Sequence, residues 1–144
     1  MQALMVCIGN ICRSPLAEAE FRLRYPDWQV ASAGLAALVH HPADPFAVSV
    51  GADVGIDLSA HRARLLSSTH VHDADLILVM TSGQLRDLLV RWPEVRGKAY
   101  RVGHWINRDV NDPYRHPREA FEQAHADIVA GLAAWQPYLK HFRV

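Results

Sequence analysis

The feature that most constrains the fold is an uninterrupted apolar run at residues 76–80, with the sequence Leu-Ile-Leu-Val-Met. A strand with one face in water would alternate apolar and polar residues, so this run predicts a strand that is buried on both faces. Strands of this kind occur in parallel sheets, which need helices on both sides. Residues 4–6, Leu-Met-Val, form a second, shorter run. The chain is therefore expected to be an α/β protein.

The rest of the chain continues this pattern. Residues 28–33 and 99–102 indicate two more strands, and helices are expected at residues 15–25, 45–54, 65–72, 82–92 and 118–136, the last closed by Pro137. Strands that alternate with helices form right-handed βαβ units. A length of 144 residues suits one compact core. We therefore predict a single domain, 1–144, with a four-stranded parallel sheet flanked by helices on both faces.

Charge and composition exclude several classes of function. Lys plus Arg and Asp plus Glu number 15 each, which gives a formal net charge of zero. Proteins that bind nucleic acid or membrane surfaces usually carry a basic excess, so no nucleic-acid partner is expected. No apolar run is long enough to span a bilayer, and the first residues carry no basic leader and no small-residue cleavage site. A cytoplasmic protein without membrane insertion is expected.

One segment joins the first strand to the first helix, with the sequence Cys7-Ile8-Gly9-Asn10-Ile11-Cys12-Arg13-Ser14-Pro15. Ligands of parallel sheets bind at the carboxyl ends of strands, and a helix N-terminus at that place favours an anion. Gly9 and Asn10 tolerate the positive φ that curls a loop into a nest of N–H groups. Ser14 suits the helix N-cap, and Pro15 suits the first helical position. The sequence therefore predicts a phosphate loop after the first strand.

Two side chains of this loop suit the chemistry of phosphate esters. Cys7 begins the loop, where the N–H nest, the helix end and Arg13 would stabilise its thiolate, the nucleophilic form of cysteine. The planar guanidinium of Arg13 can bind two phosphate oxygens at once. A bare cysteine and arginine at this spacing would usually be a core residue and a surface residue, but the complete segment between strand and helix is far more specific. We interpret Cys7 as the nucleophile and Arg13 as the phosphate clamp.

The chain has only two cysteines, Cys7 and Cys12. They cannot form a disulfide scaffold, and no second cysteine pair exists to complete a zinc site. We expect no metal and no other cofactor. Cys12 either packs under the loop or forms a reversible disulfide with Cys7, and the spacing leaves both possibilities open.

The loop segment resembles the signature of the low-molecular-weight protein tyrosine phosphatases. The resemblance covers essentially the whole chain and continues through Ser32-Ala33-Gly34, Ala43-Asp44-Pro45, His61-x-Ala63-Arg64 and Asp112-Pro113-Tyr114-Arg115. It implies a four-stranded parallel sheet and metal-free hydrolysis through a phosphocysteine intermediate. It also implies a role for Asn10 in holding the loop shape and for Ser14 in bonding the thiolate. The phosphate-binding loop would comprise Ile8, Gly9, Asn10, Ile11, Cys12 and Ser14 around the nucleophile.

A second loop offers the general acid that the departure of a phenolate requires. Pro113 restricts Asp112 to an extended or turn conformation, which can aim its carboxyl group inward. An isolated Asp-Pro pair would usually be only a turn. The resemblance implies that Asp112 protonates the leaving group and then activates water. It also implies that Tyr114 and Leu38 form walls of the substrate cleft.

Three alternatives share parts of this pattern. Phosphoarginine phosphatases of the same fold carry threonine where this chain has Ile11, whose apolar side chain suits an aromatic ring. Related arsenate reductases need cysteines farther along the chain, and none follows Cys12. A non-catalytic phosphotyrosine-binding module would keep Arg13 but could lose Cys7 or Asp112, and both are present.

Further segments resemble a bacterial subgroup of the family. They are Ser32-Ala33-Gly34-Leu35, residues 93–98, and Gly103-His104-Trp105. The resemblance implies a phosphatase paired with a membrane tyrosine autokinase in exopolysaccharide or capsule production. The partner would then be a phosphotyrosine protein, namely the tyrosine-rich tail of such a kinase.

Overall fold

A computed structural model describes residues 1–140, so residues 141–144 of the expected domain lie outside the described part. One sheet contains four parallel strands in the order β2-β1-β3-β4. Their bounds are Gln2–Cys7 for β1, Gln29–Gly34 for β2, Leu76–Val79 for β3 and Ala99–Arg101 for β4. The four-stranded parallel sheet is confirmed. No helix among the first 140 residues is long and apolar enough to cross a membrane.

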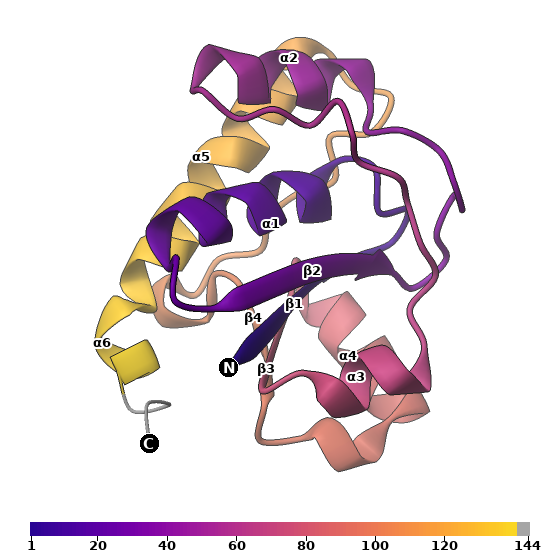
Figure 1. Cartoon of the computed structure of the whole chain (residues 1–144), viewed down its shortest axis with the longest axis vertical. Coiled ribbons are helices and arrows are strands. Elements are labelled where there is room, and N and C mark those ends of the chain that lie inside the picture. The colour runs from indigo at the N-terminus through magenta and orange to yellow at the C-terminus, as the bar shows by residue number, and fades with distance from the viewer. Residues whose placement is uncertain (141–144) are drawn as a thin grey trace.

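Helices cover both faces of the sheet (Figure 1). One face carries α1 (Arg13–Arg24), α2 (Pro45–Asp53), α5 (Arg118–Ala134) and α6 (Gln136–Leu139), and the other carries α3 (Ser68–Asp73), α4 (Ser82–Arg91) and the 3-10 turn η1 (Pro93–Val95). A second 3-10 turn, η2 (His104–Ile106), follows β4.

Successive residues of the central strands enter opposite cores, as the period of a strand requires. Met5 and Leu78 pack in the core beneath α1 and α5, whereas Val6 and Ile77 pack in the core beneath α3 and α4. All four residues are fully buried, which explains why the strands show no polar alternation. The expected flanking of both sheet faces by helices is confirmed.

Some boundaries differ from the sequence prediction. The final long helix ends at Ala134, and Pro137 lies in the first turn of α6 instead of closing the helix before it. The backbone N–H groups of a first helical turn have no partner within the helix, so the missing N–H of proline costs nothing there and proline can begin a helix. The first helix begins at Arg13 with Cys12 in the N-cap position, so the prediction of Ser14 as N-cap is wrong.

The sheet brings β2 close to the phosphate loop. A Cβ atom at Gly34, the last residue of β2, would lie 2.4 Å from the carbonyl oxygen of Ile8. Glycine therefore allows a backbone approach that other residues would prevent. This approach places the segment after β2 along one side of the loop.

Candidate active site

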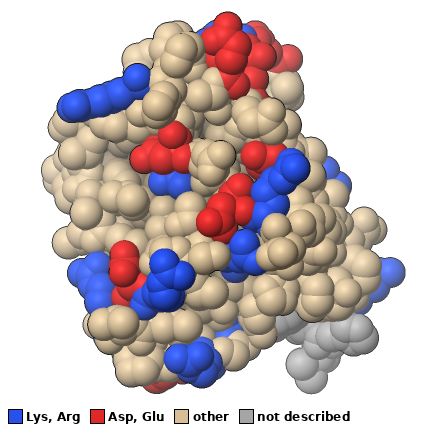
Figure 2. Space-filling model, turned by 180° about the vertical axis from the view of Figure 1, so that it is seen from behind, with Lys and Arg blue, Asp and Glu red and all other residues tan. Residues whose placement is uncertain are grey.

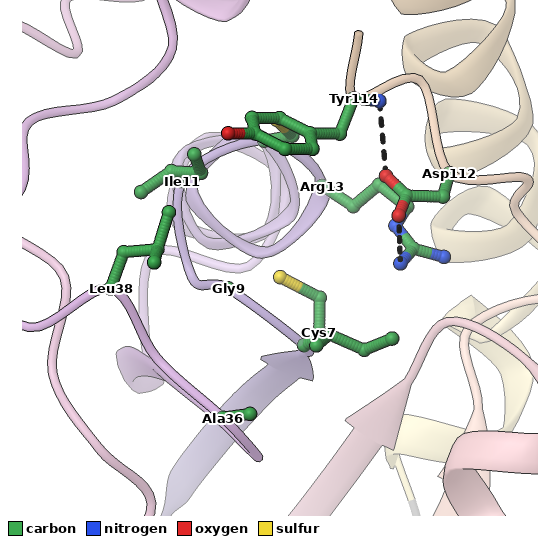
Figure 3. A pocket seen from close by; sticks show the side chains of 10 residues that line it. Cys7, Gly9, Ile11, Arg13, Ala36, Leu38, Asp112 and Tyr114 are labelled. Atoms are coloured by element: carbon green, nitrogen blue, oxygen red, sulfur yellow. Dashed lines mark hydrogen bonds and ion pairs between the residues drawn. The ribbon is translucent and has the colours of Figure 1, made fainter.

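A pocket of about 190 Å³ opens at the carboxyl end of β1 (Figure 3). It is smaller than the roughly 300–1,000 Å³ typical of sites for whole small molecules, so it suits the end of one side chain. Asn10 and Ser14, both buried, lie outside its lining, and Ala36 is an addition that the sequence did not predict. The lining residues are Cys7, Ile8, Gly9, Ile11, Cys12, Arg13, Ala36, Leu38, Asp112 and Tyr114.

The backbone of the loop turns its carbonyl groups outward. The oxygens of Cys7, Ile8, Gly9 and Ile11 accept hydrogen bonds of 2.8–3.1 Å from amides within residues 35–44. A trans peptide holds each carbonyl antiparallel to the N–H of the next residue. The amides that follow these four carbonyls therefore point toward the inside of the loop. This is the nest of N–H groups that favours a bound anion.

The sulfur of Cys7 lies at the base of this nest. It accepts a hydrogen bond of 3.3 Å from the amide of Asn10 and lies 2.9 Å from Oγ of Ser14. The left-handed turn of the loop falls on Asn10, with φ of 58°, and not on Gly9. Ser14 directs its hydroxyl to the sulfur, which explains why it does not cap the helix. In residues 1–140 no side chain caps α1, so its first amides stay open to a ligand.

A buried network holds the loop from behind. The side-chain amide of Asn10 donates to Ser14 Oγ at 2.7 Å and to Ser32 Oγ at 3.0 Å, and Ser32 in turn donates to Glu18 at 2.6 Å. His61 Nε2 lies 2.7 Å from the carbonyl oxygen of Asn10. The sequence prediction missed the supporting contacts of Ser32 and Glu18. A polar residue near the carboxyl end of a buried strand was the available signal for Ser32.

The guanidinium of Arg13 is buried beside the pocket. Its Nη1 donates to the carbonyl of Val110 at 2.9 Å, and its Nη2 lies 3.7 Å from Oδ2 of Asp112. Its buried Nε has no hydrogen-bond partner among the described residues. A buried donor without an acceptor is costly, so a ligand oxygen at this position would be favourable.

Asp112 and the cleft walls lie at the mouth of the pocket. The carboxylate of Asp112 is half exposed, and its Oδ1 accepts the amide of Tyr114 at 3.0 Å, which fixes an Asx turn. The Tyr114 ring extends over the pocket toward Ile11, and Leu38 lies beyond it (Figure 3). The structure therefore brings together all three residues predicted for catalysis and both predicted for the cleft.

The two cysteines differ in their surroundings. Both are free thiols. Burial raises the pKa of Cys12 far above its ordinary value, and the nearby carboxylate of Asp44 and the sulfur of Cys7 raise it further. The Cys12 side chain is therefore a neutral thiol at neutral pH, whereas the Cys7 sulfur accepts the backbone amide of Asn10 and contacts the Ser14 hydroxyl.

Comparison with known proteins agrees with this geometry. The family model described as low molecular weight phosphotyrosine protein phosphatase matches residues 2–143. The probable low molecular weight protein-tyrosine-phosphatase EpsP of Ralstonia solanacearum is 49% identical over 137 residues, covering 95% of this chain and 94% of EpsP.

Two solved structures are similar over nearly the full chain. Vibrio vulnificus Wzb, in complex with benzylphosphonate, has a TM-score of 0.91 at 39% identity and covers 95% of this chain and 97% of its own. The arginine phosphatase YwlE of Geobacillus stearothermophilus has a TM-score of 0.90 at 29% identity, and the match covers 99% of this chain and 94% of YwlE. By the match of the family model and the identity to these relatives, the chain belongs to the low-molecular-weight protein-tyrosine-phosphatase family.

Proposed function

We propose that the protein hydrolyses phosphotyrosine through a phosphocysteine intermediate, with Cys7 as nucleophile, Arg13 as phosphate clamp and Asp112 as general acid and base. The observation that carries this proposal is the buried, unpartnered Nε of Arg13 in a pocket that also holds the Cys7 sulfur. A phosphate oxygen would give Arg13 its missing acceptor. The inward amides of the loop would bind the other oxygens and hold phosphorus above the sulfur.

Two displacements at phosphorus complete the reaction. In the first, the Cys7 thiolate forms an S–P bond as the bond from phosphorus to the tyrosyl oxygen breaks, and Asp112 gives its proton to the departing oxygen. In the second, the Asp112 carboxylate takes a proton from water, the water oxygen bonds to phosphorus, and the S–P bond breaks. The thiolate is regenerated, and inorganic phosphate leaves.

The contact between Arg13 and Asp112 suits this double role. Without substrate, Nη2 of the guanidinium lies 3.7 Å from Oδ2 of the carboxylate. A bound phosphate dianion would occupy Arg13 and place negative charge close to Asp112. Asp112 would then stand beside the ester whose departing oxygen needs a proton.

Covalent trapping tests the proposal. The purified protein should release phosphate from a phosphotyrosine peptide, and rapid quenching during turnover should leave phosphate attached to the peptide that contains Cys7, as detected by mass spectrometry. Phosphate release without any labelled Cys7, or label on another residue, would contradict the mechanism.

Phosphoarginine hydrolysis is the second candidate, favoured by the similarity to YwlE. Ile11 lines the pocket and offers a ring an apolar contact but gives a guanidinium no acceptor. Phosphotyrosine peptides should therefore be preferred. Ile11→Thr should raise the ratio of phosphoarginine to phosphotyrosine kcat/KM by about tenfold, because pockets discriminate strongly through hydrogen bonds. Ile11→Val, which adds no hydroxyl, is the control, and a parent enzyme that already prefers phosphoarginine would refute the role of Ile11.

We also propose that the protein acts in the cytoplasm on the tyrosine-rich tail of a membrane tyrosine autokinase in exopolysaccharide or capsule production. Similarity to EpsP and Wzb supports this role, and the cytoplasm keeps the reactive thiol reduced. Dephosphorylation of such a tail should be faster than that of an unrelated phosphotyrosine peptide. Equal kcat/KM values for the two would argue against the autokinase as partner.

A further inference from the structure

A second pocket, of about 460 Å³, lies next to the catalytic pocket. Tyr114 lines both, so the two spaces adjoin at this residue. Most of the remaining lining consists of rings and planar groups: Pro45, Phe46, Arg115, His116 and Phe121. The second pocket is therefore within reach of residues that neighbour a phosphotyrosine bound in the first.

Phe46 gives this pocket a fixed, open aromatic wall. It lies in the first turn of α2, where the carboxylate of Asp44 accepts its amide at 2.9 Å and Pro45 starts the helix. Its ring lies 5.4 Å from the ring of the fully buried Phe121, at an angle of 56°. The Phe46 side chain is nevertheless 43% exposed. One part of the ring is thus held by the core, and the rest is available to a ligand.

Arg115 closes the rim in an unusual conformation. Its φ is 65°, a left-handed value that few residues other than glycine adopt and that often marks functional loops. The guanidinium carbon lies 5.3 Å from the centre of the Tyr114 ring. The neighbouring backbone is fixed by the hydrogen bond from Tyr114 to Asp112 and by one of 2.9 Å from His116 to Pro113. The turn therefore holds a planar cation beside the ring of Tyr114, where the two pockets adjoin.

These walls suit an aromatic side chain better than an aliphatic or acidic one. Rings gain from edge-to-face or offset contacts with other rings, and Phe46 and Phe121 are part of this lining. An aliphatic side chain would lose these ring contacts. An acidic side chain would meet the carboxylate of Asp44 on the same lining, while Arg115 is already engaged with Tyr114.

The distance across Tyr114 selects the position of that side chain. Two groups in contact with opposite sides of one ring stand about 7–8 Å apart, because each contact needs about 3.5–4.0 Å. In an extended peptide, residues i and i+2 project to the same side about 6.6–6.8 Å apart, whereas neighbours project to opposite sides. We propose that this second pocket binds an aromatic side chain two residues from the phosphotyrosine. The inference rests on the proposed function, which places phosphotyrosine in the first pocket.

Matched phosphopeptides test this subsite. The peptides differ at one position only, either one or two residues before or after phosphotyrosine, which carries Phe, Leu, Glu or Ala. Phe two residues away, on one side, should raise kcat/KM about tenfold over Ala, through ring contacts in the second pocket. Phe46→Ala should abolish this gain and leave hydrolysis of p-nitrophenyl phosphate, which fills only the first pocket, unchanged.

Two further variants keep the test decisive. Phe46→Leu retains apolar packing on Phe121 but removes the ring, so it should also lose the gain if Phe46→Ala folds poorly in a thermal melt. Val90→Ala removes a more exposed apolar side chain from α4, 82% exposed and outside both pockets, and should retain the gain. The subsite is overturned if the Phe and Ala peptides have equal kcat/KM. It is also overturned if Leu or Glu at the same position, or Phe next to the phosphotyrosine, raises kcat/KM as much as Phe two residues away. Survival of the gain in both Phe46 variants would overturn it too. Failure of the parent to hydrolyse p-nitrophenyl phosphate would instead overturn the proposed function.

Discussion

Cys7→Ser should lower kcat for p-nitrophenyl phosphate by at least about 10⁴-fold, because removal of an enzyme nucleophile typically costs this much or more. The loop places the backbone amide of Asn10 and the hydroxyl of Ser14 against the side chain at position 7, but it contains no base placed to remove the proton of a serine. The variant should still bind inorganic phosphate, because Arg13 and the inward amides remain. Steady-state kinetics measures the first effect, and the phosphate-dependent rise in melting temperature measures the second.

Cys12→Ser is the matched control, since it makes the same exchange at the other cysteine of the loop. The Cys12 thiol is neutral because burial raises its pKa, so it is not the attacking group. Its replacement should cost far less in kcat than replacement of Cys7, and any loss should reflect packing. Equal losses in the two variants, or full activity in Cys7→Ser, would remove Cys7 from the chemistry.

The charged surface is mixed, in keeping with the balanced composition. Figure 2 shows Lys and Arg interspersed with Asp and Glu on the face opposite to that of Figure 1, with no continuous field of one sign. Long-range attraction therefore contributes little to substrate choice on this face. Under the proposed function, selection among phosphoproteins would then depend on close contacts at the pocket mouth, such as those proposed for Tyr114 and Phe46.

The strands could be predicted because their signal is local. Residues 76–80 are all apolar, which by itself predicts burial on both faces of the sheet, and the loop after β1 contains a complete motif. Contacts between distant segments left no such signal. The carbonyl of Val110 holds Arg13 across 97 residues, and the segment at 35–44 is joined to the phosphate loop by hydrogen bonds between backbone groups. Backbone groups are common to all residue types, so no side-chain pattern marks these contacts.

Ser14 shows how a correct local preference can fail. Serine before proline is a favoured helix N-cap, and on local grounds the prediction was sound. In the fold, however, the hydroxyl oxygen lies 2.9 Å from the Cys7 sulfur and accepts a hydrogen bond from the side-chain amide of Asn10. The tertiary contact replaces the cap, and the uncapped amides of α1 become part of the candidate anion site. The position where local prediction fails is thus one where the proposed function has a use for the side chain.

Asp112→Ala should lower kcat for alkyl-substituted phenyl phosphates by about 10²–10⁴-fold, the usual contribution of a general acid. In kcat/KM, which reports only formation of the S–P bond, the loss should be much smaller for p-nitrophenyl phosphate, whose phenolate leaves readily without a proton. KM should not rise, because Asp112 carries the negative charge nearest to Arg13 and its removal eases the binding of a phosphate dianion.

Asp112→Asn separates proton transfer from loop structure. The amide oxygen of asparagine can still accept the amide of Tyr114, as Oδ1 of Asp112 does at 3.0 Å, so the Asx turn should survive. It cannot give or take the proton, so kcat should fall as far as in Asp112→Ala. The decisive measurement is the dependence of log(kcat/KM) on the leaving-group pKa across a series of aryl phosphates, because kcat/KM reports only the steps up to formation of the S–P bond. This dependence should be steeper in both variants than in the parent. If the slopes are equal and all substrates lose the same factor, Asp112 acts on loop geometry and not on the departing oxygen.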